Sequence, residues 1–194
     1  MTTCSEFLYV ELGVPSMKTR VLIKQWKFWK KVMELNDSDP LRYAISLGKQ
    51  LNLKEITHYE NLISRYENVE QIVDEHRNAN ESSIRNKAER GRSRYVSYLT
   101  GNPLLVKPSV YDSTYSHSNF SMISKLRTIS HNLQIYMGRR TCTLRENRKC
   151  ICGEIEDEPH FLLNCPLYTN LRSRFNISIN SKIQNVLNDS TLLE

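Results

Sequence analysis

Three cysteines and one histidine lie within sixteen residues, and this cluster constrains the fold more than any other feature of the chain. One residue separates Cys150 from Cys152, seven more precede His160, and four more precede Cys165. Zinc prefers four tetrahedral nitrogen and sulfur ligands, and this spacing supplies them from a single segment. Because protein ligands would fill all four positions, the sequence predicts a structural zinc site with no position for a substrate or an activated water.

The residues between these ligands are typical of a tight turn followed by a short helix. Gly153, directly after the second cysteine, supplies a permissive backbone for the turn. Pro159 suits the first turn of a helix, where its missing N–H leaves no hydrogen bond unmade. Three acids just before this proline complement the positive end of a helix dipole: Glu156, Asp157 and Glu158. We therefore expect a small knuckle, defined here as residues 148–168, that zinc holds together.

The remaining cysteines are Cys4 and Cys142. Cys142 is an alternative ligand, although the seven residues between it and Cys150 favour a free thiol. An odd count of five cysteines, three of them clustered, fits metal binding in a reducing compartment better than a disulfide framework. No apolar run approaches the roughly twenty residues of a membrane span, and no secretory signal is recognisable. These features predict an intracellular protein of the nucleus or cytoplasm that does not act at a membrane.

Positive charge is concentrated directly before the knuckle. The chain has 27 basic and 21 acidic residues, a net charge of +6. Between residues 121 and 149 there is one acid, Glu146, and there are seven bases: Lys125, Arg127, Arg139, Arg140, Arg145, Arg148 and Lys149. Such a segment favours contacts with the phosphates of RNA or DNA, and Tyr136 is a candidate for stacking on a base. The acids between the ligands would by contrast repel phosphate.

Apolar residues recur at three- and four-residue spacing along most of the chain, which predicts a mainly α fold. The clearest stripe consists of Leu22, Trp26, Trp29 and Met33. Six bases and no acid accompany it between residues 18 and 31, and two interpretations are open. In the first interpretation, the basic side chains contact nucleic acid. In the second, they form a solvated face on a helix that its tryptophans hold in place, as runs of charge commonly do.

The domain organisation follows from changes in composition. Residues 1–100 form a helical region in which the polar segment 76–94 is either an extended helix or partly disordered. Prolines and small polar residues over 101–119 predict a linker. Residues 120–180 hold a helix, a short strand at 133–137, the basic segment and the knuckle, and residues 181–194 form a weakly structured tail.

The carboxyl-terminal third of the chain carries a specific set of motifs. They are Leu126-Arg127, Ser130-His131-Asn132-Leu133, Ile135, Gly138-Arg139, the run RKCICG at 148–153, the run EDEPHFLLNCPLY at 156–168, and Arg172. This set resembles the zinc-binding region that follows the reverse transcriptase domain in the polyprotein of LINE-type (non-LTR) retrotransposons. Residues 11–15 (ELGVP) and the basic helix after them resemble the segment that precedes this region. The resemblance implies template RNA or target DNA as ligand and a reverse transcriptase domain as partner.

Catalytic motifs are missing from the chain. A polymerase needs clustered carboxylates for two metal ions, and no Asp-Asp pair occurs in the sequence. Ser130 and His131 are adjacent, but neighbours in a chain do not place side chains for catalysis, so packing or capping is the expected role. The sequence therefore predicts a non-catalytic module that binds zinc and nucleic acid. The alternative is a zinc-stabilised structural or protein-interaction fragment that does not bind nucleic acid.

Overall fold

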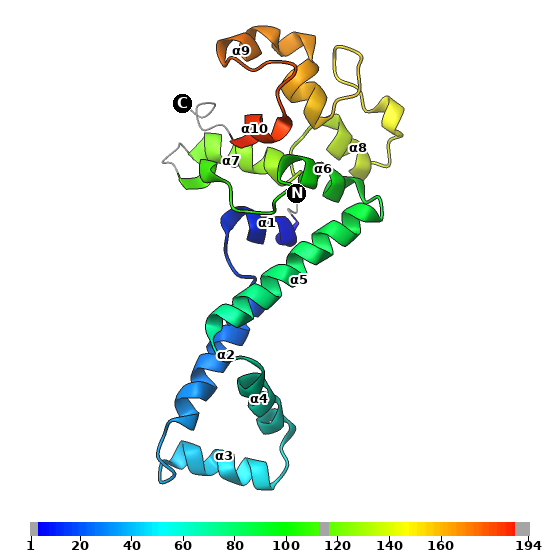
Figure 1. Ribbon diagram of the computed structural model, residues 1–194. Coiled ribbons are helices and arrows are strands. Elements are labelled where there is room, and N and C mark those ends of the chain that lie inside the picture. Colours follow the sequence, from blue (N-terminus) through cyan, green and yellow to red (C-terminus); the bar gives the residue numbers. More distant parts are fainter. Residues whose placement is uncertain (1–3, 113–116, 189–194) are drawn as a thin grey trace. The chain divides into compact units, whose positions relative to one another are not determined.

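The computed structural model describes residues 4–112 and 117–188 and is mainly helical, as expected (Figure 1). Its α-helices are α1 (Ser5–Leu12), α2 (Met17–Met33), α3 (Pro40–Gln50), α4 (Lys54–Arg65), α5 (Val69–Glu89), α6 (Ser93–Gly101), α7 (His117–Arg127), α8 (Gln134–Arg140), α9 (Thr169–Arg174) and α10 (Ile183–Asn188). Within the described residues, extended pairing is limited to an isolated bridge between Lys149 and Ile155. Across those same residues, no helix combines the length and apolar character that crossing a bilayer requires.

The chain divides into two units at positions that the composition did not indicate. Unit 1 comprises Met1–Gly13 and Ser83–Glu194, and unit 2 comprises Val14–Ser82. The expected linker at 101–119 does not separate these units. Leu105 and Val110 from that segment are 4% and 0% exposed, so they belong to a core. Residues 113–116 of the expected linker lie outside the described residues.

Unit 2 begins with helices whose starts are fixed by local hydrogen bonds. Ser16 caps α2 by accepting a hydrogen bond from the backbone N–H of Thr19. The side chain of Asp39 caps α3 by accepting from the N–H of Leu41, and Pro40 occupies the first turn, where a proline lacks no hydrogen bond. Asn68 lies between α4 and α5, and its side chain accepts a hydrogen bond from the N–H of Gln71 in the first turn of α5.

The core of unit 2 is built on the tryptophan stripe. Trp26, Leu62, Tyr66 and Ile72 form one buried cluster, and the indole N–H of Trp26 donates to the Tyr66 carbonyl at 3.0 Å. The ring of Trp29 stacks on a tyrosine of α4 with centroids 4.5 Å apart. The stripe therefore holds α2 against α4, as its spacing predicts.

Unit 1 has a separate core that gathers residues from distant parts of the sequence. Its buried members are Phe7, Val10, Ile84, Tyr98, Leu105, Ile129 and Tyr136. Phe7 stacks on Tyr98 with ring centroids 4.0 Å apart. The polar run 76–94 is ordered as α5 and the start of α6. Glu6 helps to hold it, since its carboxylate accepts hydrogen bonds from Ser83, Lys87 and Tyr95.

One local prediction in unit 1 is wrong. Residues 134–137 form the first turn of α8 and Leu133 directly precedes it, so the predicted strand at 133–137 is absent. Ile135 and Tyr136 are both buried although they are consecutive, which a helix permits and one face of a strand does not. Within the predicted weakly structured tail, residues 183–188 form α10, whose Val186 and Leu187 are 6% and 5% exposed, and residues 189–194 lie outside the described residues.

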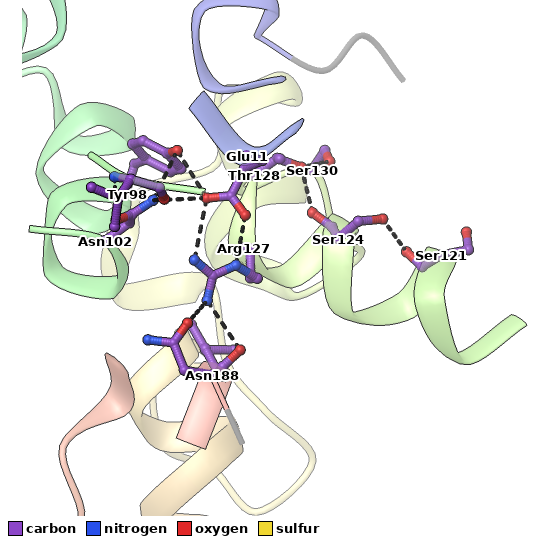
Figure 2. Close-up of polar contacts among 11 residues, drawn as sticks. Glu11, Tyr98, Asn102, Ser121, Ser124, Arg127, Thr128, Ser130 and Asn188 are labelled. Atoms are coloured by element: carbon purple, nitrogen blue, oxygen red, sulfur yellow. Dashed lines mark hydrogen bonds and ion pairs between the residues drawn. The ribbon is translucent and has the colours of Figure 1, made fainter. Parts of the chain in front are cut away.

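Glu11 and Arg127 form an ion pair at the centre of unit 1 (Figure 2). The Nε of Arg127 lies 2.6 Å from Oε2 of Glu11, and both side chains are 2% exposed. The carboxylate also accepts hydrogen bonds from Tyr98 at 2.9 Å and Asn102 at 3.1 Å. Arg127 donates in addition to the Leu187 carbonyl and to the side chain of Asn188. One buried network thus joins α1, α6, α7 and α10.

We predict that Arg127→Met lowers the free energy of unfolding by about 3–5 kcal/mol, because it leaves a buried carboxylate without its partner. The double variant Glu11→Gln/Arg127→Met removes both charges and keeps an acceptor for Tyr98, so it should lose less than the single variant. Urea denaturation measures both values. Equal losses in the two variants would show that the ion pair is not what makes the single substitution costly.

Candidate metal centre

The four predicted ligands converge on one point. The ligand atoms of Cys150, Cys152, His160 and Cys165 all lie within 4.8 Å of one another. The Sγ of Cys165 is 3.7 Å from that of Cys150 and 4.0 Å from that of Cys152, and the Sγ of Cys152 is 3.2 Å from Nε2 of His160. A disulfide bond measures about 2.05 Å, so these sulfurs are separate thiols. The cluster can hold a metal ion.

A tight hairpin presents the first two ligands. Its ends are joined by the bridge between Lys149 and Ile155, and the N–H of Cys150 donates to the Glu154 carbonyl at 2.8 Å. Gly153 adopts a φ of +97°, a conformation that side-chain-bearing residues rarely reach, which explains the glycine after the second cysteine. The single residue between the cysteines, Ile151, points outward and is 96% exposed.

A π-type turn presents the other two ligands. Asp157 caps the turn by accepting from the N–H of His160 at 2.9 Å. The N–H of Cys165 then donates to the His160 carbonyl five residues back, at 2.7 Å. In an α-helix, residues five apart point about 140° away from each other. The wider π turn reduces this angle and brings both ligands to the same side, so the predicted short helix is present with a different hydrogen-bond pattern.

The environment of the thiols is compatible with metal binding. Cys150 and His160 are each 8% exposed, and Cys165 is fully buried. The backbone N–H of Cys152, helped by His160 and the neighbouring thiols, lowers the pKa of Cys150 to about 7, although burial acts in the opposite direction. Burial raises the pKa of the Cys165 thiol. Since a metal binds thiolates, the lowered pKa of Cys150 favours its metal-binding form near neutral pH.

Glu156 attaches the knuckle to α8, although the sequence predicts that it stabilises the helix that begins at Pro159. The carboxylate of Glu156 accepts from the N–H of Gln134 at 2.7 Å, and its carbonyl accepts from the N–H of Ile135 at 2.9 Å. Both donors belong to the first turn of α8, where backbone N–H groups lack partners within the helix. Glu156 therefore caps α8 and does not act on the helix that follows it in sequence.

His131 and Glu158 form a second attachment. The Nε2 of His131 lies 2.9 Å from Glu158, and Nδ1 accepts from the N–H of Leu133 at 3.3 Å. Burial acts to raise the pKa of Glu158, but the hydrogen bond to His131, the backbone and the charge of Arg139 together lower it. Because both side chains are buried, this pair fastens the segment before α8 to the knuckle. The hydroxyl of Ser130 shares a hydrogen bond with that of Thr128 at 2.7 Å.

Several predicted nucleic-acid contacts are corrected by burial. Arg127 is 4% exposed in its ion pair, and Tyr136 is 7% exposed against the guanidinium of Arg94, so neither is presented to a ligand. Arg139 is half-buried, and burial lowers its pKa. The predicted cations that remain on the surface are Lys125, Arg140, Arg145 and Lys149.

Arg148 is also occupied within the fold. Its Nε and Nη2 donate to the Thr143 carbonyl at 2.9 and 2.7 Å, and Nη1 lies 3.4 Å from the Ile135 carbonyl. The side chain crosses directly over Gly138, where an added Cβ would lie 2.5 Å from Cγ of Arg148. Arg148 therefore closes the basic loop between α8 and the knuckle, and a glycine at position 138 leaves room for it.

Comparisons with protein-family models, with curated proteins and with solved structures found no match to this chain. The class of protein is therefore defined by its own fold and site. It is a mainly helical protein with a Cys₃His cluster able to hold a metal ion.

We predict that Gly138→Ala destabilises the protein by about 1–3 kcal/mol, because the new methyl group displaces the Arg148 side chain. Helix propensity alone would give the opposite result, since alanine is favoured over glycine in a helix by about 1 kcal/mol. In an Arg148→Ala background the same substitution should no longer cost stability. Thermal denaturation of the four proteins tests this, and an equal cost in both backgrounds would refute the steric explanation.

We predict that His160→Ala and Cys152→Ser each abolish metal binding and loosen the knuckle. Where a metal site is absent from the unfolded chain, the free energy of metal binding is also free energy of folding. Elemental analysis measures the metal content, and hydrogen exchange of residues 148–168 measures the loosening. Cys142→Ser is the matched control, because Cys142 is exposed and lies outside the cluster. Loss of metal in the control, or its retention in both ligand variants, would contradict the assignment.

Proposed function

We propose that this chain is a non-catalytic module that binds zinc and, through an adjacent basic surface, RNA or DNA. The observation that carries the proposal is the closed set of three thiols and one imidazole next to exposed cations. Soft thiolate and imidazole ligands favour zinc. Four such ligands in tetrahedral array around zinc have sulfur atoms about 3.8 Å apart, and the observed separations of 3.7 and 4.0 Å agree with this value.

Zinc would supply structure and no chemistry in this module. All four positions of a tetrahedral ion are taken by side chains of this chain, which leaves none for a reacting group. Two ligands come from the hairpin and two from the π turn, so the ion would join these two segments to each other. Lys149 directly precedes the first ligand, and its position on the surface therefore depends on the integrity of the metal centre.

Nucleic acid as the ligand is supported by charge. Lys125, Arg140, Arg145 and Lys149 are exposed, whereas the acids Glu156 and Glu158 from the same region are engaged by α8 and His131. Because these two carboxylates are bonded within the fold, they neutralise less of the surface positive charge than the sequence suggests. Contacts between such cations and phosphates release counterions and weaken steeply with salt.

The resemblance to the zinc-binding tail of LINE-type retrotransposons supports the same proposal. Several of its motifs have a structural purpose here: the Ser-His-Asn-Leu motif and the Glu-Asp-Glu-Pro-His motif meet in the pair of His131 with Glu158, and Gly138 makes room for Arg148. On this proposal the chain derives from such a tail, and a reverse transcriptase domain is its partner in the parent element.

The second candidate is a zinc-stabilised interaction fragment that does not bind nucleic acid. It is favoured by Arg127 and Arg148, because two of the seven cations predicted to bind phosphate are committed to the protein itself. It is also favoured by Ile151, an apolar side chain that the knuckle holds almost fully exposed.

A salt titration separates the two candidates. We predict that the full chain binds a single-stranded oligonucleotide and that its association constant K falls as the salt concentration rises. Each phosphate that a cation neutralises on a single strand contributes about 0.7 to the steepness of log K against log salt concentration. Arg145→Ala/Lys149→Ala should therefore make this dependence shallower by about 1.4. Arg90→Ala/Arg92→Ala is the matched control, since both arginines are exposed in unit 1 and outside the knuckle. Absence of binding at low salt would favour the interaction fragment. Equal changes in the two variants would show that the basic surface beside the knuckle is not the binding site.

A further inference from the structure

Helix α2 in unit 2 has an exposed face that the fold does not use. Its buried side faces the core of unit 2 through Trp26, Trp29 and Val32, which are 8%, 9% and 2% exposed. The rest of the helix carries six bases and no acid: Lys18, Arg20, Lys24, Lys27, Lys30 and Lys31. The structure thus settles that the tryptophans are buried, but it leaves the charge unexplained.

Four of these bases form one line. Arg20, Lys24, Lys27 and Lys31 are spaced four, three and four residues apart, which places them on the same side of the helix over about 17 Å. All four are exposed. We call them the α2 cationic stripe. Lys18 and Lys30 lie at other angles around the helix and do not belong to it.

An apolar strip runs beside this stripe. Met17, Val21 and Phe28 are 65%, 48% and 51% exposed, and their spacing of four and seven residues places them together. Phe28 follows Lys24 by four residues and precedes Lys31 by three, so its ring borders the stripe. The face therefore combines a line of positive charge with one exposed aromatic ring.

The α2 cationic stripe has no counter-charge within the described part of the chain. None of its four members forms an ion pair with a described acid, while the bases Arg42, Lys49 and Arg65 elsewhere in unit 2 each do. Arg20 donates to the Pro15 carbonyl, which leaves its charge uncompensated. Like charges four residues apart on a helix destabilise it by a few tenths of a kcal/mol per pair, so this arrangement is a cost to the isolated protein that an anionic ligand would remove.

We propose that this face binds single-stranded nucleic acid, with phosphates along the α2 cationic stripe and a base stacked on Phe28. Single strands offer both a line of negative charge and free base faces, which match the two components of the surface. A membrane surface fits less well, because a helix lying in a bilayer buries a broad apolar face, and the broad apolar face of α2 is already packed in unit 2. This proposal names a second surface for the ligand class proposed above but rests on different residues.

The test compares two double variants of the full chain that remove the same charge from the same helix. Lys24→Ala/Lys27→Ala removes two cations from the stripe, and Lys18→Ala/Lys30→Ala removes two from other sides of α2. Alanine is the best helix former, so neither variant weakens α2 intrinsically, and circular dichroism verifies this. Fluorescence anisotropy with a labelled single-stranded oligonucleotide gives the affinity at several salt concentrations.

We expect log K of the stripe variant to depend less steeply on log salt concentration than that of the control variant, by about 1.4 in the slope. Phe28→Ala should weaken binding at least about fivefold while leaving the salt slope unchanged, because stacking releases no counterions. Equal slopes in the two double variants would overturn the proposal. It would also be overturned if vesicles containing anionic lipid bound the chain in a stripe-dependent manner and the oligonucleotide did not.

The two nucleic-acid surfaces can fail separately. If Arg145→Ala/Lys149→Ala binds like the original chain while the stripe variant loses affinity, the knuckle proposal fails and the α2 proposal stands. The reverse pattern removes the α2 proposal and leaves the knuckle. Chelation of the metal provides an independent check, because unit 2 contains none of the four ligands and its contribution to the salt slope should persist.

Discussion

The ion pair between Glu11 and Arg127 is the interaction on which the architecture of unit 1 depends. Glu11 comes from the first described helix and Arg127 from the end of α7, 116 residues later. A charge pair whose side chains are each only 2% exposed needs every remaining lone pair and proton satisfied, and Tyr98, Asn102 and the backbone of Leu187 provide these contacts. These directed hydrogen bonds join specific atoms of α1, α6, α7 and α10 at one point.

The Cys₃His cluster depends in turn on this unit through two acids. Glu156 caps α8, and Glu158 accepts from His131, so the segment between the ligands is anchored at two points. Glu158 is only two residues from His160, so its contact with His131 attaches the segment that carries this ligand to the rest of unit 1. The knuckle is consequently part of the folded unit and is more than a flexible loop that carries cysteines. Its acidic composition, which looks unfavourable for phosphate in the sequence, largely reflects these attachments.

The sequence predicts the features that depend on local patterns. The helical class, the start of α3 at Asp39 and Pro40, the tryptophan stripe and the convergence of the four ligands follow from spacing and capping. The features that it does not predict depend on tertiary contacts. Nothing in a single sequence distinguishes a surface arginine from Arg127, whose partner is more than a hundred residues away, and the alternation at Leu133, Ile135 and Met137 imitates a strand until the burial of Tyr136 is known.

The closeness of the ligands in sequence has a consequence for the order of folding. Cys150 and Cys165 are fifteen residues apart, His131 and Glu158 twenty-seven, and Glu11 and Arg127 one hundred and sixteen. The entropy lost on closing a loop grows with its length, and contacts between distant residues slow folding. Of these three contacts the knuckle closes the shortest loop, so it can assemble during synthesis as soon as its own residues are available. The central ion pair, by contrast, closes a loop of more than a hundred residues, and its network is complete only when Leu187 and Asn188 have also been made.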